Sequence, residues 1–510
     1  MSQETSENNK RIAKNTFFLY FRMLLSMVVS LYTSRVIINT LGVSDYGIYG
    51  VVGGVVSMFT FLNASMAGAT SRFITYALGK KDKQLLDETF SMAFYEHLCI
   101  AFAILLVVET VGVWFLNDKM VIPADRLAAA NWVLQFSALS MVINVTQVPY
   151  SSSIIAHEKM DIYAYVELVN TFLRLIIVYL LMVGDYDKLI LFGLLNMIVS
   201  IIIAMSYRIY CIRKFNECHI KFIWRKELFM KMISFSGWDL YGNLSITART
   251  QGVNMLLNLF FGPTMNAAAS IASRVQGIIL GFAKNITTAV RPQIVKYYAQ
   301  QKYEEMAHLM HNSVRINFFI LCFLSVPFIA EMHYVFHLWL GIVPDYAIIF
   351  CTFTLLFNFF SNLSHIIVIG IHATGKIFRP SFINGTLYLL VVPVSYVGFR
   401  LGMDSWTSYA FNVLAVFIGM LSNAYTLNMY VKQFKVKDFV IKDLIPCMLT
   451  FILAFAACML TVKTMEESFV RLILTTLLSS ILLVIMGIAF ILPKTFTQGV
   501  YTKIKSKLNK

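Results

Sequence analysis

The sequence has few charged residues for its length, and acidic residues are the scarcer kind. Asp, Glu, Lys and Arg make up 14% of the 510 residues, whereas hydrophobic residues make up 58%. A water-soluble domain is typically about 25% charged and 45–50% apolar. Apolar runs of about 20 residues, the length that crosses a bilayer, recur along the whole chain. The composition therefore excludes a water-soluble protein and predicts an integral membrane protein.

Cysteine pairs and metal-ligand spacings are also missing from the sequence. The seven cysteines include no Cys-x-x-Cys pair, and five of them lie inside apolar runs, where cysteine packs as a small hydrophobic residue. His365 and His372 share a helix face, but neither has a carboxylate or a cysteine close by in the sequence. We therefore expect no metal site, disulfide or cofactor.

Fourteen apolar segments can be separated, and each is bounded by Gly, Pro, Asn or charged clusters. We expect helices, because hydrocarbon offers no water to satisfy the backbone groups of an open strand or loop. The N-terminal "MSQETSENNKRIAKN" precedes the first segment without a small-residue cleavage site, which predicts a retained tail and not a signal peptide. The predicted spans are centred near residues 27, 58, 103, 138, 172, 200, 246, 279, 318, 359, 390, 418, 453 and 481.

Lysine and arginine are distributed unevenly between the two sides of the predicted membrane. With the N-terminus placed in the cytoplasm, 27 of the 42 basic residues fall in inner tails and loops and six in outer loops, Arg471 among the six. Such a bias sets the orientation of membrane proteins and predicts that both termini are cytoplasmic. The net charge of +15 then follows from the inner loops and their attraction to anionic lipid, and we expect no nucleic-acid partner.

A weak internal repeat relates residues 38–88 to residues 257–306. Arg72 matches Arg291 and Gly42 matches Gly262, at nearly constant offsets. An even number of helices separates the copies, so the sequence predicts two parallel six-helix repeats around a central cavity, followed by two further helices. The predicted domains are a cytoplasmic tail at 1–13, a lobe at 14–214, a cytoplasmic linker at 215–231, a second lobe at 232–432, two helices at 433–493 and a basic cytoplasmic tail at 494–510.

Nine basic residues lie inside the predicted spans. Arg35, Arg72 and Arg291 are near helix ends, where long side chains can reach the interface. Six deeper cations facing lipid would cost about 15–20 kcal/mol in total, so they are expected to face protein or water. The six are Arg22, Arg174, Arg249, Arg274, Lys284 and Arg315.

Carboxylates at membrane depth are fewer than these cations. We expect Glu167 to neutralise Arg174, seven residues further along the same helix, whereas Asp239 either pairs with Lys284 or serves as an ion-coupling carboxylate. The remaining positive excess predicts an anionic ligand, because an uncompensated buried charge is costly. Phosphate is favoured, since the planar guanidinium binds it in a bidentate fork.

The segments "SRVIINTLGVSDYGIYGVV" (34–52) and "SRFITYALGKKDKQLLDETFSMAF" (71–94) resemble the multidrug/oligosaccharidyl-lipid/polysaccharide (MOP) exporter superfamily, and specifically the bacterial O-antigen and polysaccharide flippases. The resemblance implies two six-helix bundles, alternating access, and translocation of undecaprenyl-pyrophosphate-linked oligosaccharide across the bacterial inner membrane. It also implies that the last two helices resemble those forming a lipid-tail groove in peptidoglycan-precursor flippases. The substrate-binding cations that it implies are Arg22, Arg249, Arg274 and Lys284, with Arg35, Arg72 and Arg291 at the rim.

The sequence thus predicts a flippase for surface polysaccharide synthesis and not an enzyme, because the outer loops are too short for the catalytic loops of a membrane polymerase or ligase. Membrane lipids, a polysaccharide polymerase and chain-length machinery are the expected partners. Two alternatives share the architecture. A cation-coupled multidrug exporter would need acids in its lumen, and a lipid-linked peptidoglycan-precursor flippase would be essential for cell-wall growth.

Overall fold

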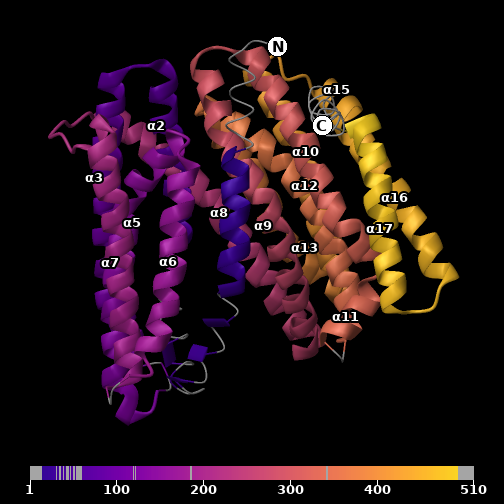
Figure 1. The fold of residues 1–510 in the computed structure, drawn as a ribbon, viewed down its shortest axis with the longest axis horizontal. Helices are drawn as coiled ribbons and strands as arrows, with labels where there is room; N and C mark the ends of the chain where they lie inside the picture. The colour runs from indigo at the N-terminus through magenta and orange to yellow at the C-terminus, as the bar shows by residue number, and fades with distance from the viewer. Residues whose placement is uncertain are drawn as a thin grey trace, which may run out of the picture. The chain divides into compact units, whose positions relative to one another are not determined.

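The chain folds into helices throughout the part that the structure describes (Figure 1). The computed structural model describes residues 14–29, 60–118, 122–183, 186–340 and 343–491, with residue 120 and scattered positions between 32 and 52. The chain divides into two compact units, Met1–Leu240 and Tyr241–Lys510. The boundary lies inside a single helix, α8 (Lys226–Phe261), which continues without a break from one unit into the other.

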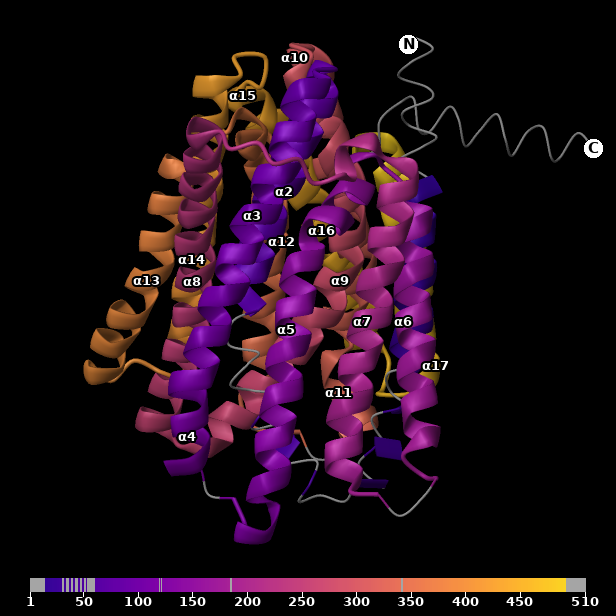
Figure 2. The same ribbon diagram turned by 90° about the vertical axis from the view of Figure 1, so that its left-hand side faces the viewer.

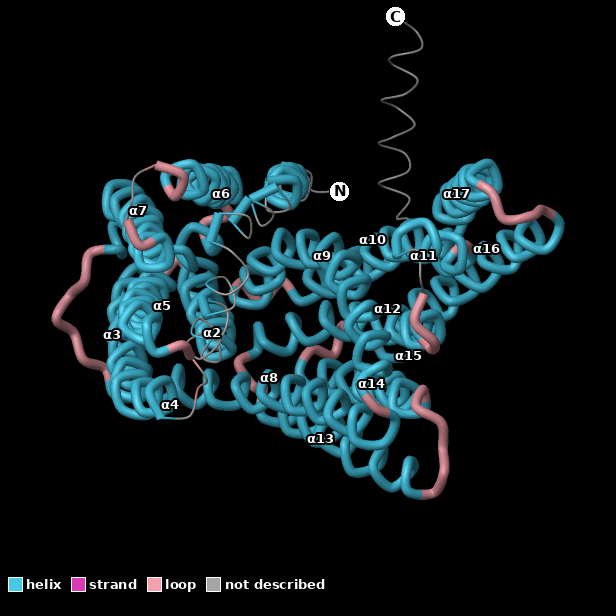
Figure 3. The backbone as a smooth tube through the Cα atoms, turned by 90° about the horizontal axis from the view of Figure 1, so that it is seen from below, coloured by secondary structure: helices cyan, strands magenta, loops and turns pink. Residues whose placement is uncertain are grey.

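The first unit is a bundle in which α5 occupies the central position. α5 packs against α2, α3 and α7, and α7 packs in turn against α6 (Figures 2 and 3). α3 continues through a π-helical turn at Val108–Gly112 into α4. The described helices of this unit are 14–29, α2 (Thr60–Lys80), α3 (Lys83–Val107), α4 (Val113–Asp118), α5 (Leu127–Ala156), α6 (Met160–Leu180), α7 (Lys188–Lys214) and the first part of α8.

The second unit is built around α12, which packs against α9, α10 and α14, while α14 also packs against α13. The C-terminal helices α16 and α17 pack against each other and against α10. The helices of this unit are the rest of α8, α9 (Pro263–Ala299), α10 (Tyr303–Ala330), α11 (Met332–Leu340), α12 (Ala347–Thr374), α13 (Phe378–Arg400), α14 (Thr407–Tyr430), α15 (Val436–Asp438), a π-helical turn (Phe439–Leu444), α16 (Ile445–Thr464), α17 (Phe469–Met486) and a second π-helical turn (Gly487–Ile491).

Short polar side chains and glycines set several helix ends. Asp82 caps α3 by accepting a hydrogen bond from the Leu85 backbone N–H at 3.0 Å. Asp187 caps α7 in the same way, which satisfies backbone donors that the first turn of a helix leaves free. Gly375 ends α12 with a φ of 79°, in the left-handed region that glycine enters without a steric penalty.

Ten helices of the described residues are long and apolar enough to cross a membrane, which makes the chain a multi-pass membrane protein. Four of the fourteen predicted spans are not among these ten. Helix 14–29 is short as far as it is described, and α2, α8 and α9 are long enough but less apolar or more charged. The count of fourteen spans therefore stays a prediction.

Polar residues lie inside the second unit, where they join helices to one another. The Asn317 side-chain amide on α10 donates to Asn362 on α12 at 3.1 Å and to Thr287 on α9 at 3.2 Å. Asn423 on α14 donates to Ser364 on α12 at 2.9 Å. These side-chain amides form hydrogen bonds between helices, as is usual for polar groups inside a helical membrane protein.

Two buried ion pairs fasten the C-terminal helices to α10, and both correct the sequence analysis. In the middle of α10, Arg315 donates to Asp443 at 2.6 Å, and His311 also contacts this carboxylate. Arg471 of α17 donates to Glu331 at 2.8 Å, and Glu331 is the residue just past the end of α10. Arg315 is therefore not an unpaired cation. Arg471 does not belong to an outer loop, because it is buried within α17.

The two-unit division differs in position from the predicted linker. The sequence analysis places the connection at residues 215–231, whereas the unit boundary falls between Leu240 and Tyr241, inside α8. Most of the predicted linker precedes α8 and packs with the first unit. For example, Lys221 contacts Asp87, and Arg225 contacts Glu88 on α3. The predicted lobe bounds remain a prediction that rests on the repeat.

Candidate functional site

Arg249 is a buried cation in the second unit that has no acidic partner among the described residues. It lies on α8 and is 8% exposed. Its guanidinium carbon is 4.7 Å from the ring centroids of both Phe357 on α12 and Tyr388 on α13. Such cation–π contacts stabilise a cation without neutralising it. The Nη1 atom of Arg249 has no hydrogen-bond partner, so a donor remains available.

A small polar cavity of about 60 Å³ adjoins Arg249. Its polar lining includes Asn254 on the next turn of α8, Gln276 on α9 and Asn412 on α14. The Gln276 amide donates to Asn358 at 3.1 Å, whereas the Asn412 carbonyl oxygen has no partner. The cavity has room for a few water molecules but not for a sugar-pyrophosphate headgroup. Arg249 can therefore offer one donor to an anion or a hydroxyl group there.

The other predicted cations of the second unit lie on α9. The side chains of Arg274 and Lys284 are exposed, and neither has an ion-pair or hydrogen-bond partner among the described residues. Ser273, the neighbour of Arg274, lines the Arg249 cavity. Lys284 and Arg291 lie close enough to His365 on α12 for their charges to act on its imidazole ring.

The predicted cations of the first unit occupy aromatic surroundings. Arg22, on helix 14–29, places its guanidinium 5.3 Å from the ring centroid of Tyr163 on α6. Arg72 on α2 is buried, with its guanidinium 4.5 Å from the centroid of Phe73 and 5.8 Å from that of Phe235 on α8. Arg35 lies outside the described residues. The structure thus brings Arg249, Arg274, Lys284 and Arg291 into the second unit and places Arg22 and Arg72 in the first.

The predicted neutralisation of Arg174 by Glu167 is wrong. Arg174 donates to Asn170 at 3.1 Å and to Asn196 on α7 at 3.3 Å, while Glu167 accepts from the Tyr207 hydroxyl at 3.1 Å. Seven residues place the two side chains on one helix face but about 10 Å apart along the axis. Amide oxygens from the same helix and its neighbour satisfy the guanidinium instead.

Because Arg174 is exposed and bonded to neutral amides, its removal is expected to cost little. We predict that Arg174→Ala changes the free energy of unfolding by less than about 1 kcal/mol and leaves function intact. Thermal unfolding of the purified variant, together with its activity in cells, checks this. A loss of function at normal protein level would show that Arg174 contacts the transported molecule.

Asp239, the predicted coupling carboxylate, lies on α8 within the first unit, while Lys284 belongs to the second unit. Its pairing with Lys284 and its role in coupling both remain predictions. A different carboxylate, Glu96 on α3, is 2% exposed and accepts a single hydrogen bond, from Ser236 at 2.9 Å. The sequence analysis gave Glu96 no role, although an acid inside an apolar run was the available signal.

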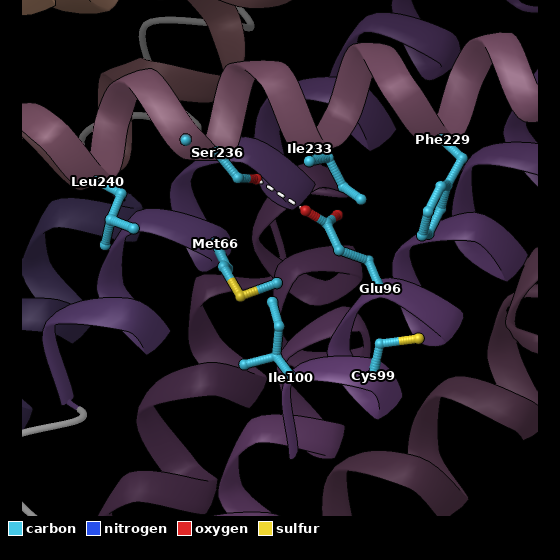
Figure 4. Close-up of a pocket in the computed structure, with 9 residues that line it drawn as sticks. Met66, Glu96, Cys99, Ile100, Phe229, Ile233, Ser236 and Leu240 are labelled. Carbon is cyan, nitrogen blue, oxygen red and sulfur yellow. Dashed lines mark hydrogen bonds between the residues drawn. The ribbon is translucent and has the colours of Figure 1, made fainter. Parts of the chain in front are cut away.

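Glu96 lines an apolar cavity of about 260 Å³ in the first unit (Figure 4). In this view the carboxylate of Glu96 points toward Ser236 on α8, and apolar side chains from α2, α3 and α8 surround the pair. The Oε2 atom of Glu96 has no hydrogen-bond partner. The residues that line the cavity are Met66, Glu96, Cys99, Ile100, Phe229, Ile233, Ser236, Gly237 and Leu240.

Comparison with known proteins identifies the fold. Residues 19–180 match the MatE family model. The fold is that of MATE transporters: the chain superposes on the crystal structure of a MATE mutant with a TM-score of 0.70, at 14% identity, over 84% of this chain and 97% of that one. A MOP superfamily transporter from Pyrococcus furiosus, described as having a binding pocket of reverse polarity, matches with a TM-score of 0.61 at 14% identity, over 82% of this chain and 96% of that one.

One curated protein is similar to part of the chain. The uncharacterized membrane protein EpsK of Bacillus subtilis (strain 168) is 19% identical over 340 residues, and the match spans 64% of each chain. Together, these comparisons show a match to the MatE family over residues 19–180 and the fold of MATE transporters over most of the chain.

Proposed function

We propose that the chain is a transporter, and not an enzyme, that translocates undecaprenyl-pyrophosphate-linked oligosaccharide across the bacterial inner membrane for surface polysaccharide synthesis. The observation that carries the proposal is the group of cations in the second unit that lack acidic partners. Arg249 is buried with a free donor, and Arg274 and Lys284 are exposed on α9 within predicted membrane depth. A cation facing lipid there costs about 2.5–3.5 kcal/mol, so these side chains favour water or an anionic ligand.

The chemistry of these side chains favours a diphosphate over a neutral or cationic cargo. Two exposed cations on one helix can contact separate phosphate oxygens, and Arg can do so in a bidentate fork. Translocation outward across an inside-negative membrane is favourable for an anion, by about 2.3 kcal/mol per charge per 100 mV. In this proposal the chain has fourteen spans with both termini in the cytoplasm, and alternating access moves the headgroup while the prenyl chain stays in lipid.

The aromatic contacts of Arg249 suggest a test that separates charge from geometry. Arg249→Lys keeps the positive charge but loses the planar group held between Phe357 and Tyr388. We expect purified Arg249→Lys in lipid vesicles to flip a lipid-linked oligosaccharide pyrophosphate at least tenfold more slowly than the wild type, at equal protein content. The readout is the fraction of the lipid-linked headgroups that a glycan-cleaving enzyme, added outside the vesicles, can reach. Equal rates for wild type and Arg249→Lys would remove Arg249 from the substrate path, and no flipping by the wild type would overturn the proposed cargo.

A cation-coupled multidrug exporter is the second candidate, because the chain shares its fold with MATE transporters. Export of organic cations would require acidic groups along the transport path. Expression in a drug-sensitive strain tests it: raised resistance to organic cations would favour this candidate, and unchanged resistance is expected from the proposed flippase.

A further inference from the structure

Glu96 on α3 is a buried carboxylate whose described surroundings do little to compensate a negative charge. Its two oxygens meet one protein donor, the Ser236 hydroxyl, and its Oε2 atom faces the cavity without a partner. No cation among the described residues pairs with it. An ionised carboxylate is costly to bury in apolar surroundings, whereas the proton-bound acid is much less so.

The groups around Glu96 leave a proton as the best ligand. Two bases of the packed helices contact other groups: on α2, Arg72 stacks on aromatic rings, and on α3 the His97 Nδ1 contacts the Ala93 carbonyl oxygen at 2.7 Å. α5 contributes Tyr150 as its only titratable side chain. Within the described residues, no group of three or more His, Cys, Asp or Glu side chains can hold a metal ion. The remaining titratable or charged groups of these elements are Tyr76 and Lys80 on α2, Lys83, Asp87, Glu88, Tyr95 and Cys99 on α3, and Lys226, Glu227, Lys231 and Asp239 on the first part of α8.

Ser236, the hydrogen-bond partner of Glu96, lies close to the unit boundary within α8. Ser236 precedes the unit boundary by four residues, and two glycines, Gly237 and Gly242, flank that boundary. A Cβ atom built on either glycine meets no atom within 4 Å. Since packing does not require these glycines, their effect is to weaken the helix locally, by about 1 kcal/mol each relative to alanine. An adjacent serine and glycine, as at Ser236 and Gly237, are also among the recognised sites of helix bending.

We propose that Glu96 is a proton-binding site whose protonation releases its contact with Ser236 and thereby changes the bend of α8 at Gly237–Gly242. In the ionised state the carboxylate holds the Ser236 hydroxyl and fixes the first part of α8 against α3. In the protonated state the neutral acid binds this donor more weakly, and the glycine segment bends. The inference holds for either cargo considered above, because it concerns the first unit and α8 alone.

Spin labels on α8 measure the bend directly. Met230 and Met255 are exposed at opposite ends of the glycine segment, about 37 Å apart in a straight helix. Cys99 is the only exposed cysteine, so Met230→Cys and Met255→Cys in a Cys99→Ser background give two labelled sites. We expect the distance distribution of the purified full-length protein in lipid to change with pH. Glu96→Gln, which mimics the protonated acid, is expected to give the low-pH distribution at every pH.

Four further variants make the test specific. Glu109→Gln, at an exposed carboxylate further along the same helical run, is the matched control and should retain the pH response. Ser236→Ala removes the contact itself, so it should give the low-pH distance distribution at every pH, as Glu96→Gln does, and Ser236→Thr should restore the pH response. Gly237→Ala with Gly242→Ala should abolish the distance change while leaving the protonation event intact.

Infrared difference spectroscopy reports the protonation event itself. The wild type should show a protonated carboxylic-acid band at low pH that Glu96→Gln removes and the double glycine variant keeps. A distance distribution that does not respond to pH, or a response that persists in Glu96→Gln, would overturn the proposal. A change produced by a lipophilic cation but not by pH would also overturn it. None of these results depends on whether the chain flips a lipid-linked glycan, so failure here and failure of the proposed function can be told apart.

Discussion

Replacement of both Arg274 and Lys284 by alanine is expected to abolish surface polysaccharide while leaving the amount of protein in the membrane unchanged. Each side chain is exposed and makes no ion pair among the described residues, so the substitutions remove no contact that stabilises the fold. Charge-assisted hydrogen bonds contribute about 1.5–3 kcal/mol each. Loss of two such bonds to a diphosphate weakens its binding by two to four powers of ten.

The matched control removes two charges at a site without a proposed role. Arg213 and Lys214 are exposed at the end of α7 in the first unit, so Arg213→Ala with Lys214→Ala changes the net charge equally. Surface glycan should be normal in this control and absent in the variant Arg274→Ala/Lys284→Ala. An immunoblot of surface glycan from cells with equal amounts of each variant protein measures this. Undiminished glycan in the α9 variant would show that these cations do not contact the cargo.

The largest expected effect on stability concerns the ion pair between Glu331 and Arg471. Their side chains are 0% and 6% exposed, and Thr475 also donates to this carboxylate at 2.8 Å. Removal of one partner leaves an uncompensated buried charge, which costs about 3–5 kcal/mol. We therefore expect Arg471→Met to lower the thermal unfolding midpoint of the purified protein substantially.

Two comparisons identify the cause of that loss. Glu331→Leu combined with Arg471→Met removes both charges and should be less destabilised than Arg471→Met alone, because no buried charge is left unpaired. Lys442→Ala breaks an exposed pair with Asp438 and should cost less than about 1 kcal/mol. If Arg471→Met were no less stable than Lys442→Ala, the ion pair would not fasten α17 to α10.

The helical architecture could be predicted from the sequence, because each apolar run is a local feature of the chain. Apolar runs bounded by residues such as Asp187 and Gly375 coincide with helices that begin or end at those residues. Spans that carry the predicted substrate-binding cations were the hardest to classify. α8 and α9 carry Arg249, Arg274 and Lys284, and the same residues that suggest a function make these helices less typical of a membrane span.

The partners of the buried charges could not be predicted because they are distant in sequence. Asp443 lies 128 residues from Arg315, and Glu331 lies 140 residues from Arg471. The sequence analysis placed Arg471 in an outer loop and gave Arg315 no acidic partner, so it overestimated the unpaired positive charge inside the spans. Arg22, Arg249, Arg274 and Lys284 keep the predicted lack of acidic partners among the described residues.

The central claim is that the unpaired cations of the second unit bind a diphosphate, and a direct binding measurement tests it best. Purified protein is titrated with a short-chain polyprenyl pyrophosphate and, separately, with the corresponding uncharged polyprenol. We predict that the wild type and the Arg213→Ala/Lys214→Ala control bind the pyrophosphate at least tenfold more tightly than the polyprenol, and that Arg274→Ala/Lys284→Ala loses this preference. Equal affinity of the wild type for both lipids, or an unchanged preference in the α9 variant, would contradict the account.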